Sequence, residues 1–328
     1  MLIWLVFFLS ATIIVYTGYK LTKFTDELAE ISNISRGWLG FILLASVTSL
    51  PELITTITSA ILNVREQAIG NIFGSNNFNI LIVGILALFF VSSKLKSDDS
   101  ERTNILTGTL YISFTLFFIL WLWIESKFKL SFTFIGIDLL SYFIIVFYGI
   151  SIFLVSSGVK ENSTDNKNIS QPVPKLIIAK ILILSIVVVL TGILLSWSVK
   201  NIAVTYNLGF TFAGAVLLAV VTSLPELVVT ISSIHLSSPE MAHSNLLGSN
   251  IFNLTNLAIA DFFYKGSIYS NSLEKSTPLI IGSIFLTALM LLDIIKPPKF
   301  FLFKRLSLTK TLIILFYFGI IYLSWIVK

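Results

Sequence analysis

The sequence lacks cysteine altogether and is poor in charged residues. None of its 328 residues is a cysteine, and only 12% are Asp, Glu, Lys or Arg. A soluble domain usually carries about twice that fraction of charged residues. The absence of cysteine excludes a disulfide framework, a thiolate metal site and thiol redox chemistry. The scarcity of charge argues against a soluble domain, and we expect no enzymatic activity, no cofactor and no nucleic-acid binding.

Hydrophobic residues dominate instead, at 55% of the chain, and they gather in long unbroken blocks. A single transmembrane helix needs roughly 20 mostly apolar residues to cross the hydrocarbon layer. The sequence therefore predicts an all-α membrane protein with ten transmembrane helices. The ten blocks cover residues 2–20, 37–62, 67–93, 105–124, 131–156, 176–198, 209–235, 240–264, 277–295 and 308–326.

The two halves of the chain repeat each other at an offset of 174 residues. Residues 45–58 read ASVTSLPELITTIT and residues 219–232 read AVVTSLPELVVTIS, with ten of fourteen positions identical. At the same offset, GNIFGSNNFNI at 70–80 aligns with SNLLGSNIFNL at 244–254, with six of eleven identical. Unrelated apolar helices would not share two polar motifs in the same order and spacing, so we infer an internal duplication.

A polar segment divides the chain almost in half. We predict a first five-helix repeat at 1–156, a cytoplasmic linker at 157–175 and a second five-helix repeat at 176–328. Because five is odd, the second repeat enters the membrane inverted, which is the plan of many secondary transporters. An outside N-terminus assigns fourteen Lys and Arg to inner loops and seven to outer ones. The positive-inside rule therefore favours a multi-pass cell-membrane protein with both termini outside.

Two glutamates occupy matching positions deep inside apolar blocks. Glu52 lies sixteen residues into the second block, and Glu226 lies at the matching place in the seventh. A carboxylate at membrane depth costs at least about 2.5–3.5 kcal/mol. Neither block has a Lys, Arg or His within two helical turns of its glutamate. The natural partner of the two carboxylates is therefore a bound cation, or else a proton.

Proline precedes each glutamate and is expected to break helices 2 and 7. Pro51 and Pro225 each remove a helical hydrogen bond, which frees carbonyl oxygens about one turn upstream. Such backbone at membrane depth is tolerated where it lines a buried or watery cavity. Hydroxyl oxygens accompany these carbonyls, on Thr48, Ser49, Thr222 and Ser223.

The second motif adds further oxygen ligands. Ser75 and Asn79 are four residues apart on one predicted helix face, as are Ser249 and Asn253. The resulting ligand set contains only oxygen and carries two formal negative charges. It suits Ca²⁺, which takes 6–8 oxygens, and Na⁺, which is similar in size. With no cysteine and only two histidines, zinc, copper and iron are poor candidates.

TSLPEL followed by GNxxGSNxxN, present in both halves with Ser244 replacing the first glycine in the second, resembles the calcium/cation antiporter superfamily, most closely its prokaryotic sodium/calcium exchangers. The resemblance implies an antiporter in which Na⁺ and Ca²⁺ alternately occupy one central site. Relatives often have Asp where this chain has Asn253, and the potassium-dependent branch is among those with an acid there, so potassium coupling is not expected. The proton-coupled branch usually has Glu where this chain has Gly74 and Gly248, so sodium coupling is favoured. The implied ion ligands are Glu52, Glu226, Thr48, Thr222, Ser49, Ser223, Ser75, Ser249, Asn79, Asn253 and the carbonyls of Ala45 and Ala219.

Three other functions remain open at this stage. A proton/cation exchanger would protonate Glu52 or Glu226 in turn. A passive cation channel would need an open path, whereas a pseudo-symmetric site in one chain suits alternating access. A non-transporting receptor would leave the paired carboxylates unexplained. The expected partners are Ca²⁺ and Na⁺ as substrates and the lipid bilayer, and the expected assembly is a monomer.

Overall fold

The computed structural model describes residues 2–32, 34–89, 101–128, 132–162, 174–206, 218–269, 273–295, 301–303 and 306–326. These residues are mostly helical, as the sequence predicts. The first half contains α1 (Leu2–Ser32), α2 (Arg36–Leu39), the π-helical segment η1 (Gly40–Leu44), α3 (Ala45–Thr48), α4 (Leu50–Ile61), α5 (Arg65–Phe89), α6 (Glu101–Phe128) and α7 (Leu139–Asn162). The second half contains α8 (Lys175–Thr205), α9 (Leu218–Thr222), α10 (Leu224–His235), α11 (Pro239–Asp261), α12 (Leu273–Ile295) and α13 (Leu308–Ile326).

Two short antiparallel hairpins join neighbouring helices. β1 (Thr133–Phe134) pairs with β2 (Ile137–Asp138) between α6 and α7. β3 (Phe301–Phe303) pairs with β4 (Leu306–Ser307) between α12 and α13. Each hairpin fits a short connection between two helices that are adjacent in sequence.

Seven helices in the described part of the chain are long and apolar enough to cross a membrane, or eight if the bent helix at 36–61 is one span. The predicted seventh helix is only partly covered, because 207–217 lie outside the described residues. α11 is long enough, but its many Ser and Asn residues make it less apolar than the seven. The number of ten spans therefore stays a prediction.

Several helices run beyond their predicted ends, among them α1, α7 and α8, which ends at Thr205 rather than at residue 198. α1 continues from the predicted end at residue 20 to Ser32, because its last turns are amphipathic. They bury Leu21, Thr25 and Ala29 and expose Lys23 and Glu27. α7 likewise continues to Asn162, into the predicted linker, of which 163–173 lie outside the described residues.

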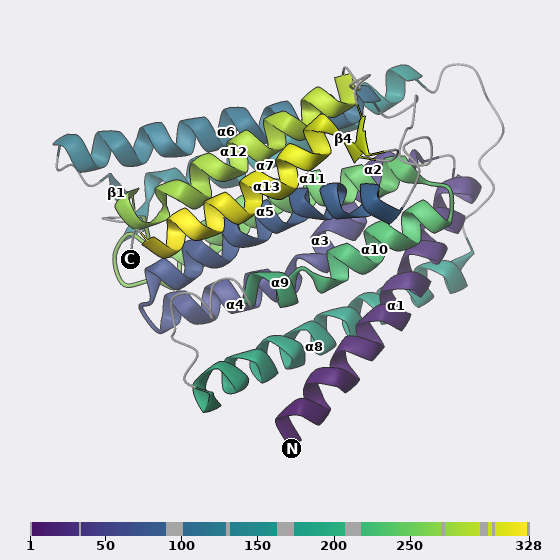
Figure 1. The fold of residues 1–328 in the computed structure, drawn as a ribbon, viewed down its shortest axis with the longest axis horizontal. Helices are drawn as coiled ribbons and strands as arrows, with labels where there is room; N and C mark the ends of the chain where they lie inside the picture. The colour runs from purple at the N-terminus through teal and green to yellow at the C-terminus, as the bar shows by residue number, and fades with distance from the viewer. Residues whose placement is uncertain are drawn as a thin grey trace.

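The helices form three layers (Figure 1). α1 and α8 cross each other on one side, and α5, α11, α12 and α13 lie on the other. The short helices α3, α4, α9 and α10 are sandwiched between these layers. In the most apolar stretch of α5, 94% of the residues are buried, whereas in that of α1 only 22% are buried. The short helices and α5 therefore form the interior, and α1 exposes apolar side chains that a bilayer would cover.

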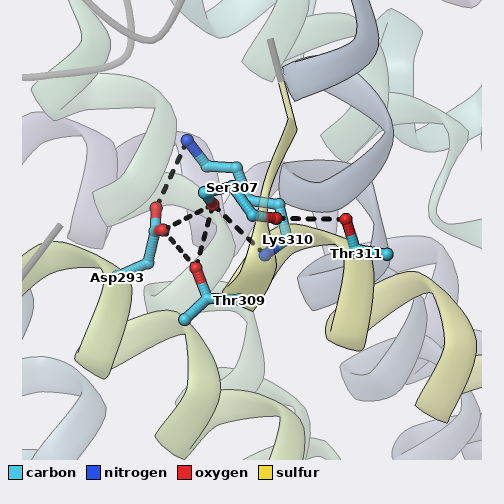
Figure 2. Close-up of polar contacts among 5 residues, drawn as sticks. All are labelled: Asp293, Ser307, Thr309, Lys310 and Thr311. Carbon is cyan, nitrogen blue, oxygen red and sulfur yellow. Dashed lines mark hydrogen bonds and ion pairs between the residues drawn. The ribbon is translucent and has the colours of Figure 1, made fainter. Parts of the chain in front are cut away.

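An ion pair between buried Lys310 and half-buried Asp293 joins α12 to α13. Figure 2 shows Asp293 at the end of α12 facing Lys310 at the start of α13, with 3.3 Å between Lys310 Nζ and Asp293 Oδ2. Ser307 Oγ donates to Asp293 Oδ1 at 3.0 Å, and the Thr309 hydroxyl donates to the same oxygen. Each charge is thereby neutralised inside the fold, so this cluster has no need of a ligand.

Gly248 lets α11 approach η1 and α3 closely. A Cβ at this position would lie 2.6 Å from the Phe41 carbonyl oxygen and 2.9 Å from the Ala45 Cβ. Any larger residue would push the two segments apart. The close approach places Ser249, the next residue of α11, beside Ala45.

We predict that Gly248→Ala destabilises the protein. Overpacking a tight contact typically costs about 1–3 kcal/mol, so the melting temperature in detergent should fall. Gly319→Ala is the matched control, since a Cβ on Gly319 in α13 would meet no described heavy atom within 4 Å. Alanine favours a helix over glycine, so the control should melt at or above the wild-type temperature. Equal melting temperatures for the two variants would contradict the close approach.

Candidate cation site

Two serines mark the breaks in the helices that carry the glutamates. Ser49 separates α3 from α4 with φ −90° and ψ 5°, and Ser223 separates α9 from α10 with φ −85° and ψ 9°. The first break bends the helix by 43°. The sequence predicted carbonyl oxygens without a helical donor near these prolines. The two breaks fall one residue after Thr48 and one residue after Thr222. Each glutamate then lies in the first turn of a new helix, where the helix dipole stabilises negative charge.

Each serine holds the carboxylate of the other half. Ser49 Oγ donates to Glu226 Oε1 at 2.9 Å, and Ser223 Oγ donates to Glu52 Oε1 at 3.2 Å. These two hydrogen bonds are related by the 174-residue repeat. They bring the two glutamates together at the interface between the halves, where both are fully buried, at 0% exposure.

The buried oxygens without a hydrogen-bond partner among the described residues include Glu52 Oε2, Glu226 Oε2, Asn79 Oδ1 and Asn256 Oδ1. The two carboxylates also repel each other electrostatically. No Lys, Arg or His within the described ranges forms an ion pair with either glutamate. An uncompensated buried charge costs several kcal/mol, so the arrangement calls for a positive ion between the carboxylates.

Hydroxyl and carbonyl oxygens flank the carboxylates. Ser249 Oγ lies 3.4 Å from Glu226 Oε1 and 3.5 Å from the Ala45 carbonyl oxygen and from Thr48 Oγ1. In the other half, Ser75 Oγ lies 3.4 Å from Thr222 Oγ1. Thr222 in turn donates to the Ala219 carbonyl oxygen at 3.2 Å. The residues predicted from the motifs are therefore gathered in one buried region.

Four asparagines lock α5 to α11 beside the carboxylates. Asn76 Nδ2 donates to the Asn250 carbonyl oxygen and Asn250 Nδ2 to the Asn76 carbonyl oxygen, both at 3.3 Å. Asn79 Nδ2 donates to Asn250 Oδ1 at 3.0 Å, and Asn253 Nδ2 donates to Asn76 Oδ1 at 2.8 Å. Both pairs are reciprocal under the repeat. Asn76 and Asn250 thus orient the two asparagines that were predicted as ligands.

The structure also places polar residues near the site that the sequence analysis did not select. Asn71 Nδ2 donates to Thr56 Oγ1 at 3.2 Å, and Asn245 Oδ1 accepts from Thr48 Oγ1 at 3.5 Å. Asn256 Nδ2 donates to the Ser49 carbonyl oxygen at 3.1 Å. Asn71 and Asn245 precede Ser75 and Ser249 by four residues, so helical spacing could have found them. No repeat signal marks Asn256.

The chemistry of the site is that of a hard-cation binder. Within the described ranges, no group of three or more His, Cys, Asp or Glu side chains could hold a metal ion. The two carboxylates have hydroxyl, amide and carbonyl oxygens around them instead. Oxygen-rich sets of this kind suit Ca²⁺ and related ions rather than zinc or copper.

An apolar helical fold around a buried, oxygen-lined site with two carboxylates defines a membrane cation transporter. A model of the sodium/calcium exchanger protein family matches residues 2–153 and 176–327, so the chain belongs to the sodium/calcium exchanger family. It is 27% identical over 313 residues to the sodium/calcium exchanger MaX1 of Methanosarcina acetivorans, covering 85% of this chain and 88% of that protein. It is 26% identical over 283 residues to the inner membrane protein YrbG of Escherichia coli, covering 83% and 84%.

The fold is also that of a solved exchanger. A structure of the sodium-calcium exchanger NCX_Mj, soaked with Na⁺ and no Ca²⁺, matches with a TM-score of 0.72 and 22% identity, covering 98% of each chain. At this identity the match describes the fold alone, and the ion ligands of this chain rest on its own geometry.

We predict that Ca²⁺ stabilises the protein through Glu52 and Glu226. A ligand at about 100 times its Kd adds about 2.7 kcal/mol to the free energy of unfolding, so the melting temperature should rise with added Ca²⁺. Glu52→Gln and Glu226→Gln should abolish the rise. Glu66→Gln, at an exposed position in the first turn of α5, should keep it. A full rise in either site variant would rule out the paired carboxylates as the binding site.

Proposed function

We propose that this protein is a secondary active antiporter that exchanges Na⁺ for Ca²⁺ across the cell membrane. The observation that carries the proposal is the pair of fully buried carboxylates, Glu52 and Glu226, each with one oxygen left without a donor among the described residues. One Ca²⁺ or two Na⁺ would neutralise this pair. A third Na⁺ would leave one positive charge unless a neutral subsite accepted it. Membership of the sodium/calcium exchanger family and the similarity to the sodium/calcium exchanger MaX1 support the same pair of ions.

The twelve predicted ligands would share the ion between two inverted five-helix repeats, with ten spans and both termini outside. Glu52 and Glu226 would supply the charge. The hydroxyls of Thr48, Ser49 and Ser75 and of their repeat mates would complete the shell with the Ala45 and Ala219 carbonyls. Asn79 would add its unpartnered amide oxygen. Asn253 Oδ1 already accepts a hydrogen bond from Asn256 Nδ2 at 3.2 Å. Among the twelve residues, Asn253 therefore has the weakest case for direct contact with the ion.

An asymmetry in α1 and α8 supports alternating access. Gly18 in α1 packs against Val228 of α10, where a Cβ would lie 2.9 Å from Val228 Cγ1. Its repeat mate Gly192 in α8 packs against Pro51 of α4, where a Cβ would lie 2.4 Å from Pro51 Cγ. The mate of Val228 is Ile54, which is three residues beyond Pro51. The two halves therefore use registers that differ by about 4.5 Å along the helix.

A shift of α1 and α8 along the broken helices would interchange these two registers. After the shift, Gly18 would face Pro225 and Gly192 would face Ile54. The pseudo-two-fold axis that relates inverted repeats lies in the membrane plane, so it would interchange these two arrangements together with the two sides of the membrane. We infer that one arrangement opens the site to one side of the membrane and that the other arrangement opens it to the opposite side.

A disulfide between α1 and α10 should therefore stop exchange. The chain has no cysteine of its own, and a Cβ at Gly18 would lie 3.4 Å from Val228 Cβ, close to the ~3.5–4.5 Å of a disulfide. Oxidised Gly18→Cys/Val228→Cys should lose exchange at least about tenfold and regain it on reduction. The single variants control for the substitutions. Full cross-linking with wild-type exchange would exclude this movement.

Transport itself is tested by uptake of radioactive Ca²⁺ into proteoliposomes. We expect an outward Na⁺ gradient to drive uptake, and a pH gradient or no gradient to leave it at background. Glu52→Gln and Glu226→Gln should reduce the uptake to background, and Glu66→Gln should not. Uptake driven by pH and independent of Na⁺ would instead identify a proton-coupled exchanger. Downhill flux without any counter-ion would identify a channel.

A further inference from the structure

Asn256 interrupts the symmetry of the site. It lies in α11, three residues after Asn253, and is fully buried. Its repeat mate in α5 is Ile82, which is also fully buried. The same place thus holds an amide in the second half and a branched alkyl chain in the first.

The amide nitrogen of Asn256 is fully used. Asn256 Nδ2 donates to the Ser49 carbonyl oxygen at 3.1 Å and to Asn253 Oδ1 at 3.2 Å. Ser49 is the residue at the helix break, and its hydroxyl holds the Glu226 carboxylate. Asn256 is therefore attached directly to the residues that shape the site.

The amide oxygen of Asn256, in contrast, has no hydrogen-bond partner among the described residues, although the atom is buried. Leaving a buried acceptor unsatisfied typically costs about 1–3 kcal/mol. A cation would satisfy this oxygen, as it would satisfy the unpartnered oxygens of Glu52, Glu226 and Asn79.

A comparison with Asn79 shows what has changed. Asn79 and its mate Asn253 both donate their Nδ2 to an amide oxygen across the α5–α11 interface. Asn79 then leaves its own Oδ1 unpartnered, whereas the Asn253 Oδ1 accepts from Asn256. In the second half, the unpartnered amide oxygen belongs to Asn256 instead.

We propose that Asn256 coordinates the transported cation through its Oδ1, in the place that symmetry would give to the oxygen of Asn253. This inference rests on the proposed function and assigns a ligand one helical turn further along α11. Asn253 then acts as a positioning residue between Asn76 and Asn256. Because the added ligand is neutral, the site keeps two formal negative charges.

Two substitutions separate a ligand from a hydrogen-bond donor. Asn256→Ile copies the first half and removes both the oxygen and the NH₂ group. Asn256→Asp keeps an oxygen at the ligand position and removes the NH₂ group. If Asn256 is a ligand, the Ca²⁺ concentration for half-maximal uptake should rise at least about tenfold in Asn256→Ile. In Asn256→Asp it should stay within about threefold of wild type or fall, with Na⁺ competing less effectively.

The experiment measures Na⁺-driven Ca²⁺ uptake and the Ca²⁺-dependent melting temperature of each variant. Equal losses in Asn256→Ile and Asn256→Asp would show a donor role only and overturn the inference, as would wild-type behaviour of Asn256→Ile. Asn256→Ala replaces Asn256→Ile in the comparison if the isoleucine variant does not fold. Failure of the wild-type protein to exchange would overturn the proposed function instead. If the wild-type protein exchanges the ions and the Glu52→Gln variant does not, the proposed function is supported independently of the results for the Asn256 variants.

Discussion

Glu52 and Glu226 place two negative charges at one fully buried point, with no cationic side chain paired to them among the described residues. Hydrogen bonds from Ser223 and Ser49 satisfy one oxygen of each carboxylate, and the helix starts at α4 and α10 add favourable dipoles. These interactions reduce the cost of burial without neutralising the charge. The proposed cation would complete the balance, which would couple ion binding to the stability of the interface between the halves.

The internal duplication explains why the site is built from reciprocal contacts. Each hydrogen bond that a side chain of Ser49, Asn76 or Asn79 donates across the interface has a counterpart donated by its mate 174 residues away. Two features of the described residues depart from this reciprocity. Gly18 and Gly192 contact the broken helices in different registers, which is the asymmetry that the proposed alternating access would use. Asn256 has no amide at the equivalent position of the first repeat, where Ile82 stands.

Much of this site could be predicted from the sequence, because its key residues are charged although membrane-spanning segments rarely contain charge. Glu52 and Glu226 are charged residues in apolar blocks, and the repeated motifs mark the oxygens around them. The pairing of Ser49 with the opposite glutamate was not predictable, because it depends on how the two halves dock. The same holds for Asn76, Asn250 and Asn256, whose partners lie on other helices. Hydropathy alone also describes α11 poorly, since that helix is buried among protein and tolerates many polar residues.

The position of the bound ion tests this account most directly. Anomalous diffraction from crystals soaked with Ca²⁺ would locate the ion without reference to any assay of transport. The account predicts one strong peak at about 2.3–2.6 Å from both Glu52 Oε2 and Glu226 Oε2. An ion bound elsewhere, with the two carboxylates facing lipid, bulk solvent or only protein donors, would contradict it.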